Sequence, residues 1–151
     1  MFEAKLKELG IEIPEAPKPL AAYIPVIELD KIVYTAGQLP LVNGKLFAEG
    51  KVGSDVSEED AKSAAKICAI NCLSVIKSVA GSLDNIERIV KVTVFVASEN
   101  GFTKQPVVAN GASEFLVDVF GEAGKHVRSA VGVSELPINA PVEIEMVVKL
   151  K

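Results

Sequence analysis

The sequence predicts a single α+β domain in which two helices cover one face of a mixed β-sheet. Its 151 residues are the length of one ordinary domain. Its apolar content is 49% with few aromatic residues, so the core is built mainly from Val, Ile, Leu and Ala. Strand-like segments stand before, between and after two segments of helical periodicity, with no repeat or linker between them, so we treat residues 1–151 as one domain.

The charge pattern argues against nucleic-acid and membrane partners. The formal net charge is −4, and no cluster of Lys and Arg offers a footprint for phosphates. The sequence has no basic amphipathic stretch, no signal-peptide pattern at its start and no run of transmembrane length. We therefore expect a soluble, cytoplasmic protein that binds neither nucleic acid nor membranes.

The first elements are a short helix and an extended segment. Residues 2–9 predict a helix that Gly10 ends. The proline-rich stretch from Pro14 to Pro19 can be neither helix nor central strand. We therefore assign residues 1–19 to an N-terminal extension of the domain.

Strand signals follow this extension. Residues 23–29 and 32–36 are rich in Val, Ile and Tyr, and Asp30-Lys31 predicts a tight turn between them. Asn43-Gly44 is a strong hairpin signal between residues 41–42 and 45–47. The sequence thus predicts two successive pairs of strands.

A long amphipathic helix comes next and ends at Gly81. Ser57 and Asp60 predict a capping box at its start, with the Ser57 side chain accepting from the Asp60 amide and the carboxylate reaching back. The two cysteines, Cys68 and Cys72, lie one turn apart on one helix face among apolar residues. We expect them to be small core residues, because a C-x-x-x-C spacing without nearby His is a weak metal signal.

The remainder alternates strand, helix and two strands. Residues 86–96 form the clearest strand, with Val90, Val92, Val94 and Val96 predicted on one face, and Ile89, Lys91, Thr93 and Phe95 on the other. Residues 106–120 predict a helix with Pro106 in its first turn. Its predicted buried face consists of Val108, Ala112, Phe115, Leu116 and Val119. Two strands, residues 127–133 and 142–150, complete the sheet.

Two helices can cover only one face of this sheet, yet both faces carry Val, Ile and Phe. Since the sequence has no third long helix, we expect another subunit to cover the second face.

Arg128 is the most informative candidate for a functional residue. It stands in an apolar, strand-like run, and because an arginine keeps its charge it needs an anionic partner there. That partner is either Glu143 or Glu145, which alternate on one face of the last strand, or the carboxylate of a small ligand. A partly dry cleft would raise the pKa of Glu143 and suit it to general acid–base work.

Three segments carry a resemblance to a known family. They are Tyr23, then Thr35-Ala36-Gly37-Gln38-Leu39-Pro40, then Arg128-Ser129-Ala130-Val131-Gly132-Val133 with Leu136-Pro137 and Val142-Glu143-Ile144-Glu145. The chain resembles the RidA (YjgF-type) reactive intermediate deaminases, once labelled endoribonuclease L-PSP or translation inhibitors, from about residue 19 to residue 151. The resemblance implies a chorismate-mutase-like fold and a homotrimer with a central β-barrel and sites between subunits.

The same resemblance implies an activity and a set of site residues. The activity is hydrolysis of 2-imino and 2-enamino acids, such as 2-aminoacrylate and 2-iminobutyrate, to 2-keto acids and ammonia, with no cofactor or metal. Arg128 matches the arginine that binds the substrate carboxylate, and Glu143 matches the glutamate that holds ligand or water. The remaining substrate-binding matches are Tyr23, Gly37 and Asn110.

The chain departs from the family pattern at two positions beside these residues. Ala36 stands where many members have Ser, and Ala130 stands where many deaminases have Cys. The N-terminal segment and the connection over residues 97–105 are also longer, which suggests a divergent subgroup. An alternative function is therefore a non-catalytic protein of the same fold that binds small carboxylates. The acidic charge and the lack of a basic groove argue against a ribonuclease.

Two residues, His126 and Asn110, have both a functional and a plain structural interpretation, and a third, Ser129, has no functional motif around it. His126, the one histidine, could transfer protons or could simply lie at the entry to a strand. Asn110 is followed by Gly111, a poor choice inside a helix, which marks either a site or close packing. Ser129 lies in no motif of a serine nucleophile.

Overall fold

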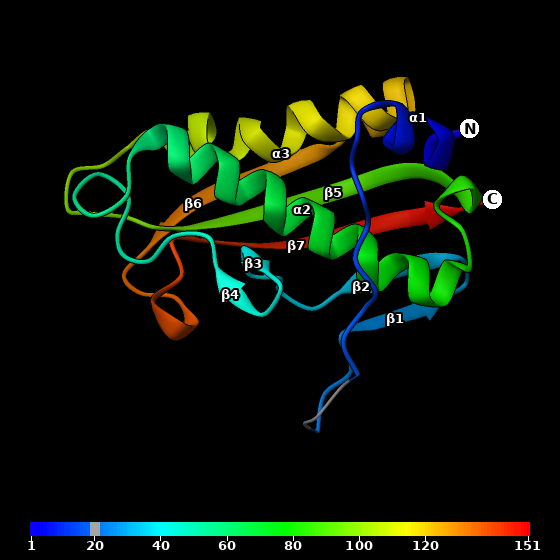
Figure 1. The fold of residues 1–151 in the computed structure, drawn as a ribbon, viewed down its shortest axis with the longest axis horizontal. Coiled ribbons are helices and arrows are strands. Elements are labelled where there is room, and N and C mark those ends of the chain that lie inside the picture. The colour runs from blue at the N-terminus through cyan, green and yellow to red at the C-terminus, as the bar shows by residue number, and fades with distance from the viewer. Residues whose placement is uncertain (19–21) are drawn as a thin grey trace.

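The computed structural model describes residues 1–18 and 22–151, which form a five-stranded mixed sheet with helices on one side (Figure 1). The strand order is β1-β2-β7-β5-β6; β5 and β6 are parallel, and every other pair is antiparallel. The sheet strands are β1 (Val26–Leu29), β2 (Ile32–Thr35), β5 (Ile86–Ala97), β6 (Val127–Val133) and β7 (Val142–Leu150). The helices are α1 (Phe2–Glu8), α2 (Glu58–Ala80) and α3 (Gln105–Phe120).

Short elements connect these parts. A separate hairpin consists of β3 (Leu41–Val42) and β4 (Lys45–Leu46), and three 3-10 turns are η1 (Leu83–Asn85), η2 (Gly121–Gly124) and η3 (Pro137–Asn139). Both predicted tight turns are confirmed, because Asp30, Lys31, Asn43 and Gly44 all have positive φ angles, as such hairpin turns require. The predicted α+β class and element order are therefore correct.

The helix α2 packs its small residues directly on the sheet. Ser57 caps its first turn by accepting from the Asp60 amide at 3.1 Å, the first of the two bonds predicted for a capping box. Cys68 and Cys72 are fully buried, and their Sγ atoms lie 3.6 Å from the Val142 carbonyl and 3.4 Å from the Ile144 carbonyl of β7. The prediction that both thiols are core residues is confirmed.

By length and composition, α2 is the one helix in the described part of the chain that could cross a membrane, which the sequence reading missed. Half of its most apolar window is buried, however. Its fully buried residues include Ala61, Ala65 and Leu73. This is the pattern of a core helix in a small soluble domain.

Two strands differ from the prediction. β1 begins at Val26 and not at Tyr23, because Pro25 has no N–H to donate to a ladder. In β5, the pairing with β7 shifts register between Ile89 and Lys91. This irregularity puts Ile89, and not Val90, on the buried face with Val92, so the predicted alternation is wrong on that side of the shift.

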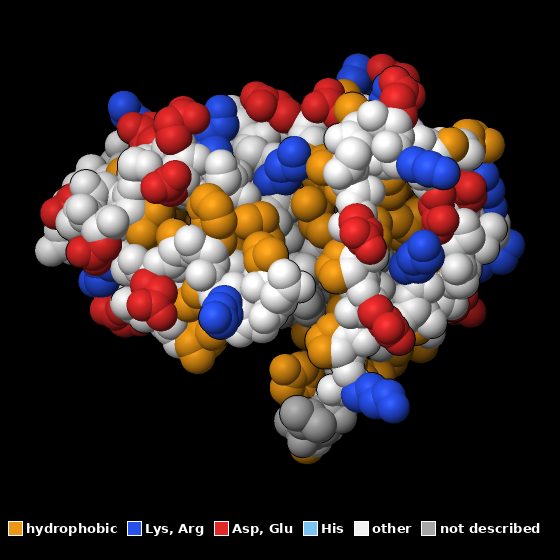
Figure 2. Space-filling view, in the orientation of Figure 1, with side chains coloured by type: hydrophobic (Ala, Val, Ile, Leu, Met, Phe, Trp, Pro, Cys, Tyr) orange, Lys and Arg blue, Asp and Glu red, His pale blue; other side chains and the backbone are white. Residues whose placement is uncertain are grey.

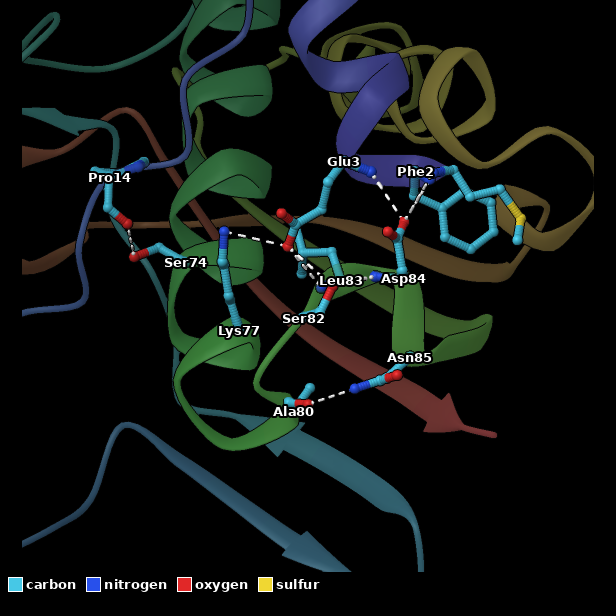
Figure 3. Close-up of polar contacts among 11 residues, drawn as sticks. Phe2, Glu3, Pro14, Ser74, Lys77, Ala80, Ser82, Leu83, Asp84 and Asn85 are labelled. Atoms are coloured by element: carbon cyan, nitrogen blue, oxygen red, sulfur yellow. Dashed lines mark hydrogen bonds and ion pairs between the residues drawn. The ribbon is translucent and has the colours of Figure 1, made fainter.

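The first residues are fastened to the turn between α2 and β5 (Figure 3). The Asp84 carboxylate accepts from the Phe2 and Glu3 amides at 2.6 and 3.0 Å, and therefore caps α1. The Glu3 carboxylate in turn accepts from the Leu83 amide at 3.0 Å and pairs with Lys77 at 3.1 Å. The predicted N-terminal extension is thus an ordered part of the domain, although Pro19, its last residue, lies outside the described residues.

The face of the sheet opposite α2 and α3 carries no helix within the described residues. Its residues alternate with the buried ones, as the strand registers require. They include Ile27, Leu29, Tyr34, Phe95, Val131 and Val147, which we call the open face. Leu29 is 58% exposed and Tyr34 is 45% exposed, which is unusual for a sheet of this composition.

Candidate functional site

Arg128 lies on β6, an edge strand, and points toward α3. In the parallel pairing of β5 with β6, Arg128 is opposite Val92, which is fully buried on the helix side of the sheet. Residues opposite one another on neighbouring strands share a face. The packing of α3 against β6 therefore decides what Arg128 contacts.

The guanidinium of Arg128 is held by neutral groups of α3. Its Nη1 donates to Asn110 Oδ1 at 2.9 Å and to Ser113 Oγ at 3.1 Å, and its Nη2 donates to the Pro106 carbonyl at 3.4 Å. None of the ion pairs among the described residues involves Arg128. Since a guanidinium has five N–H donors, donors remain on Nε and Nη2, the two nitrogens that a carboxylate can engage side-on.

Ser113 is a member of this cluster that sequence reasoning missed. It donates to or accepts from His126 Nε2 at 2.9 Å while it accepts from Arg128. The spacing could have revealed it, because Ser113 lies three residues after Asn110 and shares its helix face. His126 therefore also faces α3, although it precedes the strand.

Glu143 lies on the open face of the sheet, beside Gly37. It pairs with Phe95 across β5 and β7, and Glu145 pairs with Thr93 on the same face. A Cβ atom at Gly37 would overlap the Glu143 carboxylate, so the glycine leaves room for the position that this carboxylate takes. Burial, and then the charge of Glu145, raise the pKa of Glu143. The structure thus brings together Gly37 and Glu143, as it brings together Arg128 and Asn110.

These two groups lie on opposite faces of one sheet. We call Arg128, Asn110 and Ser113 the arginine half, and Glu143 with Gly37 the glutamate half. The alternative that Arg128 forms an internal pair with Glu143 or Glu145 is therefore wrong, because strand alternation directs their side chains away from each other. One copy of the chain therefore does not present both halves to a single small ligand.

The other sequence candidates take different places. Tyr23 precedes β1 and is 66% exposed. Ala130 pairs with Val94 and shares the face of Arg128, whereas Ser129 pairs with Thr93 on the open face and is turned away from His126. Gly111 meets the Lys62 backbone where α3 crosses α2, so the poor helix residue after Asn110 is explained by close packing.

Neither thiol nor metal chemistry is favoured by the described residues. Burial raises the pKa of Cys72 to about 12, so its reactive thiolate is scarce at neutral pH. Among the described residues, no group of three or more His, Cys, Asp or Glu side chains is placed to hold a metal.

The helix side also has an apolar hollow between the N-terminal segment and the β3–β4 hairpin (Figure 2). Its volume is about 780 Å³, and its walls include Leu39, Leu41, Ile67 and Ile70. They include neither Arg128 nor Glu143, so the hollow is separate from both halves.

The fold and these two polar clusters define a small α+β protein of the chorismate-mutase-like class. The sequence profile of the family described as "YjgF/chorismate_mutase-like, putative endoribonuclease" matches residues 3–150. The chain therefore belongs to the YjgF family, and the resemblance inferred from its sequence is confirmed.

Individual relatives agree with this assignment. Protein TCP17 of Trypanosoma cruzi is 38% identical over 148 residues, which cover 97% of this chain and 92% of that protein. A 2-iminobutanoate/2-iminopropanoate deaminase of Dermatophagoides farinae is 28% identical and covers 93% of this chain and 95% of its own length. The crystal structure of a protein of unknown function from Agrobacterium tumefaciens is 42% identical, covers 99% of this chain and 93% of its own, and superposes with a TM-score of 0.92.

Proposed function

We propose that this protein hydrolyses reactive 2-imino and 2-enamino acids, of the 2-aminoacrylate and 2-iminobutyrate type, to 2-keto acids and ammonia. The observation that carries the proposal is that neutral groups hold Arg128, which leaves its positive charge available for a ligand carboxylate. The Dermatophagoides farinae relative, whose name is that of a 2-iminobutanoate deaminase, supports the same reaction class.

The proposed site is assembled between copies of the chain. The arginine half and the glutamate half lie on opposite faces of one sheet, so a second copy must bring its glutamate half to the arginine half of the first. A homotrimer with a central barrel, with the open faces turned inward, would do this and would cover the exposed apolar residues of that face. The whole protein would then be a soluble cytoplasmic enzyme with three equivalent sites.

The proposed chemistry needs few groups because the imine is itself reactive. Arg128 binds the substrate carboxylate through Nε and Nη2 and so fixes the position of the imine carbon. Glu143 of the neighbouring copy, in its ionised form, takes a proton from a water molecule as the water oxygen bonds to that carbon. The same carboxyl returns that proton to nitrogen, which gives a carbinolamine. The carboxylate then passes the carbinolamine hydroxyl proton to nitrogen as the C–N bond breaks, so that the carbon becomes the keto group and nitrogen leaves as ammonia.

The raised pKa of Glu143 supports this double role. A carboxyl group whose pKa lies closer to neutrality is a stronger base than an ordinary glutamate, and a larger fraction of it carries the proton that the leaving nitrogen needs at neutral pH. Tyr23 and the Gly37 backbone are assigned to holding the substrate, together with Asn110, whose side-chain amide remains free to donate beside Arg128.

The experiment follows ammonia and keto-acid release from freshly generated 2-iminobutyrate. We expect the native protein to accelerate release and Arg128→Ala to lose at least about a hundredfold in kcat/KM, as for loss of a charge-assisted bidentate contact. Lys5→Ala is the control, since Lys5 is an exposed cation of α1 that pairs with Glu8 and contacts neither half. Equal rates for the native protein and Arg128→Ala would contradict the proposal.

A second candidate function is favoured by Ala36 and Ala130, which remove a hydroxyl and a thiol from the neighbourhood of Gly37 and Arg128. In this alternative the protein binds small carboxylates without turnover. A 2-keto acid would then raise the melting temperature of the native protein and leave that of Arg128→Ala unchanged, while no ammonia would form from the imine.

A further inference from the structure

Ser113 links Arg128 to His126 in a continuous chain of hydrogen bonds. Arg128 Nη1 lies 3.1 Å from Ser113 Oγ, Ser113 Oγ lies 2.9 Å from His126 Nε2, and His126 Nδ1 lies 2.6 Å from the Gly124 carbonyl. These hydrogen bonds therefore connect β6 to α3, and α3 to the turn η2 that precedes β6.

The groups at the two ends of this series of hydrogen bonds determine which partner donates in each bond. A carbonyl oxygen can only accept, so His126 carries its proton on Nδ1. Burial and the nearby charge of Arg128 lower the pKa of His126, so the ring is neutral at pH 7 and its Nε2 accepts. The Ser113 hydroxyl must then donate to His126, which turns an Oγ lone pair toward Arg128.

We infer that Ser113, oriented by His126, is a positioning residue that holds the Arg128 guanidinium in the orientation for carboxylate binding. This inference rests on the proposed function, in which Arg128 binds the substrate. Neither Ser113 nor neutral His126 carries charge, so the pair orients Arg128 without neutralising it. A carboxylate in the place of Ser113 would hold the arginine equally well but would compete with the ligand.

The contacts of Arg128 explain why Ser113 is needed in addition to Asn110 to hold the guanidinium. Both hydrogens of Nη1 are engaged, one by Asn110 and one by Ser113, and this prevents rotation of the guanidinium about its Nε–Cζ bond. Without Ser113, one Nη1 hydrogen would be unengaged, and Asn110 alone would hold Nη1. The donors on Nε and Nη2 would then be less well ordered toward a carboxylate.

The test compares four variants with the native protein. Ser113→Ala removes the acceptor for Arg128, and His126→Leu removes the group that orients Ser113. His126→Gln keeps a carbonyl oxygen that can accept from Ser113. Ser78→Ala is the matched control, because Ser78 is also a helical serine whose hydroxyl donates to a carbonyl, that of Val75, on α2.

The readouts are the Kd for 2-oxobutyrate, KM and kcat with 2-iminobutyrate, and the exchange rate of the Arg128 Nε–H measured by nitrogen-15 NMR. We expect Ser113→Ala and His126→Leu to raise Kd and KM about tenfold, the equivalent of one lost hydrogen bond to a charged group, with a smaller change in kcat. Exchange of the Arg128 Nε–H should accelerate in both. His126→Gln should recover most of the affinity, and Ser78→Ala should behave as native.

The outcomes separate this inference from the proposed function. If Ser113→Ala leaves Kd and the Arg128 exchange rate unchanged while Arg128→Ala abolishes binding, the positioning role is wrong and the carboxylate contact stands. If His126→Gln is as weak as His126→Leu, the orienting role of His126 is wrong. A native protein that binds 2-oxobutyrate but releases no ammonia contradicts the proposed reaction alone, since Kd and NMR still decide the role of Ser113.

Discussion

Arg128 shows how far a single residue can be understood from its neighbours in sequence. An arginine among Val, Ala and Gly predicts an anionic partner, and this pattern made Arg128 the leading candidate in the sequence. It did not foresee that Asn110, Ser113 and the Pro106 carbonyl would satisfy much of the guanidinium. Those partners depend on how α3 is rotated and shifted against β6, which side-chain packing decides over long sequence separations.

His126 provides a prediction about stability and pH. Its pKa is lowered in the folded protein, by burial first, from the ordinary value of about 6.5. Below that value the unfolded chain binds a proton that the folded chain does not, so the free energy of unfolding should fall as pH decreases from about 6.5 toward the folded pKa. One proton limits this slope to about 1.4 kcal/mol per pH unit.

Urea denaturation between pH 5 and pH 7 measures this effect. His126→Gln should remove the His126 contribution, so the difference in stability between native and variant should shrink at low pH. Glu143 contributes to the pH dependence of the free energy of unfolding with the opposite sign. Because the pKa of Glu143 is raised in the folded protein, its contribution to stability is lost as pH rises. The Glu143 contribution is common to both proteins and cancels in the difference; a difference independent of pH would contradict the assignment of a neutral His126.

At the scale of elements, the sequence predicted the α-helices and strands of the described residues, but not the three 3-10 turns or the contacts between the elements. Periodicity located α2, α3 and β5 because their buried faces repeat regularly. The register shift between Ile89 and Lys91 was not predictable from β5 alone, since a bulge is defined against the partner strand β7. The Asn110-Gly111 pair was ambiguous for the same reason, because only the crossing of α2 and α3 explains the glycine.

Gly111→Ala tests that crossing. A Cβ atom at this position would lie 2.7 Å from the Lys62 carbonyl carbon, so the two helices would have to separate. Alanine is otherwise better than glycine inside a helix by about 1 kcal/mol. We nevertheless expect a net loss of about 1–3 kcal/mol in the free energy of unfolding, as for other overpacked interiors.

Chemical denaturation monitored by circular dichroism measures the free energy of unfolding of the native protein and of Gly111→Ala. Val117→Ala is a suitable control on the same helix, because Val117 is 36% exposed and its truncation should change stability by less than about 1 kcal/mol. A Gly111→Ala protein more stable than native would mean that the helices do not meet closely at Lys62.

At the scale of the whole molecule, the open face is the strongest argument for self-association. The two predicted helices and the apolar residues on both faces of the predicted sheet indicated that one face would stay uncovered. The structure places Ile27, Leu29 and Tyr34 on that exposed face. The sequence could not define how copies meet, because symmetry between chains leaves no periodic pattern in one chain. The placement of Arg128 and Glu143 on opposite faces could not be predicted from the sequence either, since it depends on the register of the paired strands.

Tyr34→Glu tests association through the open face. A carboxylate on this face would have to be desolvated in an assembly, so we expect the variant to be a folded monomer where the native protein is an oligomer. Val42→Glu is the matched control, because Val42 is 47% exposed on the β3–β4 hairpin and not on the open face. Sedimentation equilibrium gives the masses, and an unchanged mass for Tyr34→Glu would contradict association through this face.

The strand order has a consequence for the growing chain. β7 lies in the middle of the sheet, between β2 and β5, although the ribosome makes it after the other four strands. Until residues 142–150 emerge, the β1–β2 hairpin and the β5–α3–β6 unit have no strand to join them. Glu143 arrives on that same strand, so the polypeptide acquires its joined sheet and the carboxyl group of the glutamate half at the same moment of synthesis.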